Sequence, residues 1–315
     1  MPRPTLAALV LAVLTACGGA DEPAATPQPR AAAQPSTAAA EAARAAAARD
    51  RVDALLAAPS PATLLAALAR PHAEARALRG PHRLHYTAKF DLVPEAKPRA
   101  VVGELIEEER HVADELTLVW ASAAGEPVRM HIKQSVGAGE EQELVVLDEQ
   151  AYTRLAHRGW QVRPLDAELH QQWLDEAQHC VHDVVELAAP ALAVAVEPAD
   201  AVVTVTLSKA EAADPARVAA GVGREWRQRT EITAVSGTIT LDRATGLWQA
   251  ADVRVGYSLR DVKDRVQRGE TQLTAEVRPA TAEDAVTAPD SARPVPERVR
   301  YEVERQELLG GLAGG

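Results

Sequence analysis

Alternation of apolar and polar residues recurs along most of this chain and constrains its fold more than any other feature. Successive side chains of a strand point to opposite faces of a sheet, so each alternating run predicts a half-buried strand. The clearest run holds Val253, Val255, Tyr257 and Leu259 between polar or small neighbours. Such runs occupy residues 83–92, 100–111, 114–122, 127–136, 143–148 and 151–155, and then 201–208, 224–235, 237–243, 247–260, 269–279 and 297–306. Because the gaps between them are short, neighbouring strands are predicted to be antiparallel.

One long helical pattern interrupts the alternating runs. Its apolar residues recur at intervals of three and four, namely Trp173, Ala177, Cys180, Val184 and Leu187. The pattern predicts a helix over 166–189 that packs on the sheet, since no other large apolar surface is expected. Shorter helices are predicted within 37–80, where Ser60 and Pro61 stand in the order of an N-cap and a first helical residue.

Charge and composition exclude several classes of protein. The chain has 315 residues with 34 Lys+Arg against 45 Asp+Glu, a net charge of −11, which argues against a nucleic-acid partner. A hydrophobic fraction of 47% with 25% charged residues is typical of a globular protein and too polar for a polytopic membrane protein. Two cysteines, Cys17 and Cys180, cannot build a disulfide framework.

The amino terminus has the features of an export signal. Arg3 precedes an apolar stretch from Leu6 to Val13 that is too short to span a bilayer. The stretch ends in Leu14-Thr15-Ala16-Cys17, which resembles the lipobox of bacterial lipoproteins. The resemblance implies a signal peptide over 1–16 and a diacylglyceryl group on Cys17 that anchors the protein in membrane lipid. It also implies the cell envelope, at the periplasmic face of the outer membrane. The alternative is a plain secreted protein with a cysteine near its cleavage site.

Three further stretches carry a family resemblance. They are Leu64–Leu68 leading into Tyr86–Phe90, Asp148–Arg154 followed by Gly159-Trp160, and Ser236–Asp242 followed by Thr245–Trp248. In order, they resemble the helix-to-first-strand entry, the mid-sheet hairpin and the late strand–turn–strand of the lipoprotein carriers LolA and LolB. The related LppX/LprG lipid-carrying lipoproteins share these features. The resemblance spans about residues 62–306, and an added 209–223 segment and a 281–296 loop depart from the family pattern.

The resemblance implies an α+β, mainly β fold. The expected architecture is a large antiparallel curled sheet, an open half-barrel of about 11–12 strands, with a helix lid and N-terminal helices. The chain would then divide into a signal peptide (1–16), a lipidated cysteine with a flexible tether (17–36), a helical segment (37–80), the half-barrel domain (81–307, with its central helix at 166–189) and a loose tail (308–315).

In that family the curled sheet surrounds an apolar interior, which implies a cavity for lipid or lipoprotein acyl chains. The candidate lining residues are Tyr86, Phe90, Leu118, Trp120, Met130, Ile132, Trp173, Val184, Ile232, Val255 and Tyr257. The alternative is that these side chains pack against one another as a dry core, because every such sheet buries one apolar face.

The best cluster for chemistry lies on the long helix. Asp175, His179, His182 and Glu186 share one helical face, and imidazole with carboxylate is a metal-ligand set. That face lies opposite the apolar stripe and is expected to be solvated. No HExxH, GxSxG, P-loop, GxGxxG or CxxC motif occurs. We therefore predict no catalytic residue, no metal and no cofactor, and we interpret Cys180 as an inert packed thiol.

Three functions remain open at this point. The first is a non-enzymatic, membrane-anchored envelope lipoprotein that binds a lipid or lipoprotein acyl chain in the curled sheet. The second is a structural or interaction lipoprotein with a filled core, which holds an envelope protein partner. The third is a metal-dependent hydrolase that uses the Asp175–Glu186 face of the long helix.

Overall fold

The computed structural model describes residues 37–95, 109–123, 125–137, 140–156, 158–217, 224–260 and 265–295. Several predicted features lie outside these residues. They are the signal peptide over 1–16, the lipidation site Cys17, the tether up to residue 36, the strand at 297–306, the tail at 308–315 and most of the strand at 100–111.

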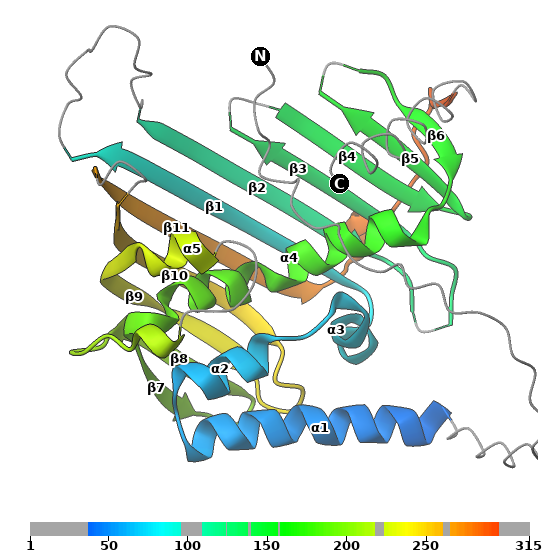
Figure 1. Cartoon of the computed structure of the whole chain (residues 1–315). Helices are drawn as coiled ribbons and strands as arrows, with labels where there is room; N and C mark the ends of the chain where they lie inside the picture. The colour runs from blue at the N-terminus through cyan, green and yellow to red at the C-terminus, as the bar shows by residue number, and fades with distance from the viewer. Residues whose placement is uncertain are drawn as a thin grey trace, which may run out of the picture.

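Within the described residues, twelve strands form one sheet in the order β12-β6-β5-β4-β3-β2-β1-β11-β10-β9-β8-β7 (Figure 1). All pairings are antiparallel except the short parallel pair of β12 with β6. The sheet is curled and unclosed, which confirms the predicted mainly β architecture. The strands are β1 His82–Pro94, β2 Arg110–Trp120, β3 Met130–Val136, β4 Glu140–Leu147, β5 Gln150–Leu155, β6 Gln161–Pro164, β7 Leu192–Pro198, β8 Val202–Lys209, β9 Thr230–Asp242, β10 Trp248–Arg260, β11 Val266–Pro279 and β12 Arg293–Pro294.

Helices cover one face of the sheet, and the sheet curls toward them (Figure 1). The α-helices are α1 Thr37–Ala57, α2 Pro61–Leu68, α3 His72–Arg79, α4 Ala167–Ala188 and α5 Arg224–Gln228, and short 3-10 turns occur at Ala189–Ala191, Pro215–Arg217 and Ala282–Asp284. The helix predicted at 166–189 is thus α4, and it lies across the inner face. Ser60 caps α2 as predicted, because its Oγ accepts a hydrogen bond from the Thr63 N–H at 3.2 Å.

Burial explains why the strands alternate. Along β10, Val253, Val255 and Tyr257 face the helices and are at most 1% exposed, whereas their neighbours face outward. The inward residues of the sheet form one core with the apolar stripe of α4, including Val181 and Val185. The inner, concave face is therefore the apolar one.

The structure corrects two of the predicted strands. The runs at 224–235 and 237–243 are a single strand, β9, and residues 224–228 are the helix α5. Gly237, with φ +149°, makes this continuity possible, because a Cβ there would lie 2.2 Å from the backbone oxygen of Asp252 on β10. The predicted gap at residue 236 is therefore absent, and Gly237 marks a close approach of two backbones.

The sequence analysis did not predict the strands β6 and β7. β7 has the sequence LAVAVEP, in which no polar residue appears before Glu197, so the alternation test fails. β6 is only four residues long. The predicted 281–296 loop contains a 3-10 turn and the short strand β12.

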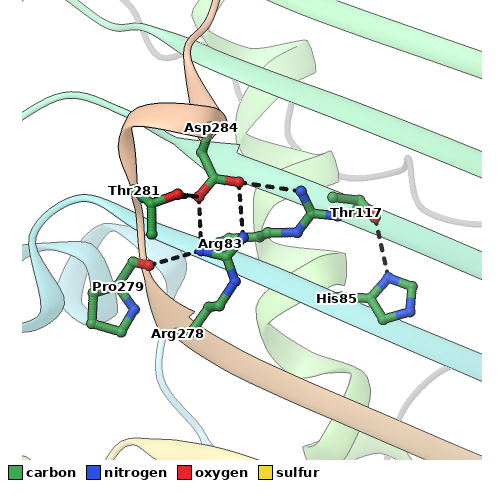
Figure 2. Close-up of polar contacts among 7 residues, drawn as sticks. All are labelled: Arg83, His85, Thr117, Arg278, Pro279, Thr281 and Asp284. Atoms are coloured by element: carbon green, nitrogen blue, oxygen red, sulfur yellow. Dashed lines mark hydrogen bonds and ion pairs between the residues drawn. The ribbon is translucent and has the colours of Figure 1, made fainter.

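A buried carboxylate ties that segment to the sheet. Figure 2 shows Asp284 accepting hydrogen bonds from Arg83 of β1, from Arg278 of β11 and from Thr281. These donors hold the pKa of Asp284 well below its usual range, with the bonds from Arg278 the largest cause. The segment is thereby fixed against the ends of two central strands.

Candidate functional site

The predicted lining residues all lie on the inner face of the sheet or on α4. Nine of them are buried, namely Tyr86, Leu118, Trp120, Met130, Ile132, Val184, Ile232, Val255 and Tyr257. Phe90 and Trp173 are half-buried and pack against the same core. Side chains from the sheet and from α4 meet directly across this face.

A set of half-buried apolar residues from α4, β1 and α5 packs against this core. On the helix it consists of Trp173, Cys180 and Leu187, which are seven residues apart and therefore share one helical face. On the other elements it consists of Ala88, Phe90 and Leu92 of β1 and Trp226 of α5. We call these seven residues the seam, because they mark where the core between α4 and the sheet meets solvent.

One end of the seam is aromatic. The ring centroids of Phe90 and Tyr257 are 6.3 Å apart, and those of Trp226 and Tyr257 are 5.7 Å apart in an edge-to-face arrangement. The Tyr257 ring also covers Gly269 on β11, where an added Cβ would lie 2.1 Å from the ring. Burial raises the pKa of Tyr257 to about 12. This part of the inner face offers aromatic surface with little charge.

The inner face over β1 to β4 is different, because a row of polar side chains crosses it. The Tyr86 Oη donates to Asp114 Oδ2 at 2.9 Å, and Gln134 Nε2 donates to Asp114 Oδ1 at 3.1 Å. Gln142 Nε2 then donates to Gln134 Oε1 at 2.8 Å. We call these four residues the polar row. Asp114, Gln134 and Gln142 are half-buried, and none of the ion pairs between described residues includes Asp114.

Sequence reasoning missed the polar row, although a signal for it was present. Gln134 has the same parity as Met130 and Ile132 on β3, and Asp114 has the same parity as Leu118 on β2. A polar residue at an inward position of an otherwise apolar strand face marks either a strand end or a polar site. The sequence alone does not show that three such positions lie side by side.

The α4 face that carries Asp175, His179, His182 and Glu186, considered above as a candidate metal-ligand set, is divided among different partners. Asp175 Oδ1 accepts the backbone N–H of His72 at 2.8 Å, and Glu186 forms an ion pair with Arg227. His182 Nδ1 lies 3.2 Å from Asp183 Oδ1. Within the described ranges, no group of three or more His, Cys, Asp or Glu residues is arranged to hold a metal ion.

The opposite face of the sheet carries two open polar grooves. One has a volume of about 470 Å³ and is lined by residues such as His85, Thr87, Thr238, Asp252 and Glu276. The other, of about 940 Å³, lies toward the far ends of β1, β10 and β11 and mixes acidic and basic side chains. Apolar ligands are therefore better matched by the inner face than by this one.

Comparisons with known proteins do not assign the chain to a family. No protein-family model matches the chain, and no curated protein matches it at a significant level. None of the helices in the described part of the chain is both long and apolar enough to cross a membrane.

Proposed function

We propose that this protein is a membrane-anchored lipoprotein of the cell envelope, similar to the half-barrel carriers, that binds lipid or lipoprotein acyl chains on the inner face of its curled sheet. The observation that carries the proposal is an apolar concave face covered by helices, across which the amphipathic α4 lies with half-buried apolar side chains along one of its sides. The Cys17 lipid anchor is the second part of the proposal.

The polar contacts of α4 indicate which side opens. Asp175 binds the backbone of His72, and Gln178 Oε1 accepts a hydrogen bond from Arg79 at 3.0 Å, so α3 holds one side of the helix. The seam lies on the other side and consists of apolar side chains, and the ion pair of Glu186 with Arg227 adds a polar contact between α4 and α5 at its Trp226 end. Burying a chain of about 12 carbons stabilises a complex by about 10 kcal/mol before ordering costs, at about 0.8 kcal/mol per methylene. That gain can replace the contacts that the seam loses when α4 moves.

The binding proposal is tested on the full chain purified under mild conditions. Native mass spectrometry and organic extraction are expected to find bound lipid. The Phe90→Glu variant, which puts a charge into the seam, is expected to lower the amount of bound lipid at least tenfold. Lys89→Glu is the matched control, because Lys89 is its exposed neighbour on β1. Lipid-free wild-type protein that takes up no added fatty acid would contradict the proposal.

The anchor is tested separately by growing cells with labelled palmitate. We expect label in the wild-type protein and none in the Cys17→Ser variant. Equal labelling of the two would contradict lipidation at Cys17, and no labelling of either would favour a plain secreted protein.

A second candidate is a structural lipoprotein with a permanently filled core. It is favoured by one observation, the complete burial of Leu118, Ile132 and Val255 between the sheet and α4. Chemical modification of Cys180 distinguishes the two functions. Cys180 lies in the seam, and it is the remaining thiol in the Cys17→Ser variant. A carrier is expected to change the rate of Cys180 modification by a thiol reagent when fatty acid is added. A rate that fatty acid leaves unchanged would favour the scaffold.

A further inference from the structure

The inner face is chemically divided along the length of α4. The polar row occupies the part over β1 to β4, and the aromatic end of the seam lies over β1, β10 and α5. Phe90 adjoins both parts, since it follows Ala88, the β1 partner of Asp114, by two residues and therefore faces the same way. An acyl chain with a polar head has the same division along its length.

The charge of the polar part points to the kind of head. Asp114 is half-buried, and its donors, Tyr86 and Gln134, are neutral. A carboxylate has about four acceptor positions, so this one can accept further donors. Burial and the neighbouring Asp114 carboxylate raise the pKa of the Tyr86 hydroxyl. A cationic donor is therefore the head that best complements this end of the inner face.

We propose that Asp114 is the headgroup contact for an amphiphile with a primary ammonium group, whose acyl chain lies along the seam past Phe90 toward Trp226. The inference rests on the proposed function, because it assumes that α4 yields to an acyl chain. An ammonium group has three donors and no acceptor, which complements the carboxylate of Asp114 and the amide oxygen of Gln142. An anionic head would be repelled by the Asp114 carboxylate.

The test compares two amphiphiles with alkyl chains of similar length and heads of opposite charge, dodecylammonium and dodecanoate, below their micelle-forming concentrations. Binding to the full chain is measured by isothermal titration calorimetry at about 150 mM salt, which screens the general attraction of an acidic protein for cations. Dodecylammonium is expected to bind at least tenfold more tightly. Asp114→Asn is expected to remove most of that preference. Glu115→Gln is the matched control, because Glu115 is exposed on the opposite face of the same strand.

A gain-of-function variant covers the case in which Asp114→Asn fails to fold. Gln142→Lys places a cation at the half-buried end of the polar row and is expected to shift the preference toward dodecanoate. Dodecanoate binding as tightly as dodecylammonium to the wild type overturns the headgroup assignment but leaves acyl binding intact. If Asp114→Asn and Glu115→Gln lose the preference for dodecylammonium equally, the assignment is also overturned. Equal losses would indicate the general attraction of an acidic protein for cations. If neither amphiphile binds, the proposed function itself fails.

Discussion

Two buried histidines make the fold sensitive to acid. His72 at the start of α3 and His82 at the start of β1 are at most 1% exposed, with ring centroids 5.8 Å apart. His82 Nδ1 donates to the Gly80 carbonyl at 2.8 Å, but both ring nitrogens of His72 are buried without a hydrogen-bond partner. Burial, aided by neighbouring positive charges, lowers the pKa of His72 to about 2 and that of His82 to about 4.

The lowered pKa values of the two histidines predict that acid destabilises the folded state. Since both pKa values lie below the ordinary value of about 6.5, the unfolded chain binds protons that the folded chain does not. Folding stability is therefore lost as the pH falls below about 6.5, down to about 4 for His82 and about 2 for His72. Between pH 7 and pH 5 each histidine costs about 2 kcal/mol, or about 4 kcal/mol together, out of a typical stability of about 5–15 kcal/mol.

The assay is urea unfolding of the full chain at pH 7, 6 and 5, followed by circular dichroism. His72→Gln, which removes one titrating group at similar volume, is expected to lower the acid loss by about half. His111→Gln is the control, because His111 is exposed and hydrogen bonds with Asp91 and Glu109 raise its pKa. Its contribution to stability is present at low pH and is lost as the pH rises, so removing it does not reduce the acid loss. A wild-type loss under about 1 kcal/mol, or an unchanged loss in His72→Gln, would refute the reasoning.

Three further substitutions test packing and capping. Gly269→Ala forces the buried Tyr257 ring to move and is expected to cost about 1–3 kcal/mol in urea unfolding, and unchanged stability would mean that the ring is not fixed there. Asp284→Asn removes the negative charge that anchors residues 281–295, so limited proteolysis should cut this segment faster, and cleavage at the wild-type rate would contradict the anchor. Ser60→Ala removes the capping box with Thr63 and is expected to lower the unfolding free energy by about 1 kcal/mol, whereas Ser60→Asp should retain most of it.

The strand pattern was predictable because the two faces of this sheet meet different surroundings. β1 and β10 each place one set of alternate residues against the helices and the other set toward solvent. Apolar residues therefore recur at every second position of these strands. β7 could not be found in this way, because its outward positions hold alanine rather than polar residues. The continuity of β9 through residue 236 was also missed, since the close approach of Gly237 to β10 depends on a neighbouring strand that a single run does not show.

The candidate site was only partly predictable. The alternation along the strands identified Phe90 and Tyr257 as residues of the inner, apolar face, because alternation needs no knowledge of strand order. The polar row required that order, since Asp114, Gln134 and Gln142 become neighbours only when β2, β3 and β4 pair in register. How closely α4 approaches the sheet depends on side-chain volumes from many strands at once, which no single alternating run contains.

The two sides of α4 make different kinds of contact. On the α3 side, guanidinium groups lie over indole rings, Arg76 over Trp120 at 4.5 Å and Arg79 over Trp248 at 5.2 Å, and Arg79 also bonds to Gln178. His72 lies on this side, edge-on to Trp120. Protonation therefore acts on the closed side, whereas a ligand entering at the seam acts on the other. If the proposed ligand enters at the seam, His72→Gln should change acid stability while leaving amphiphile binding at pH 7 unaltered.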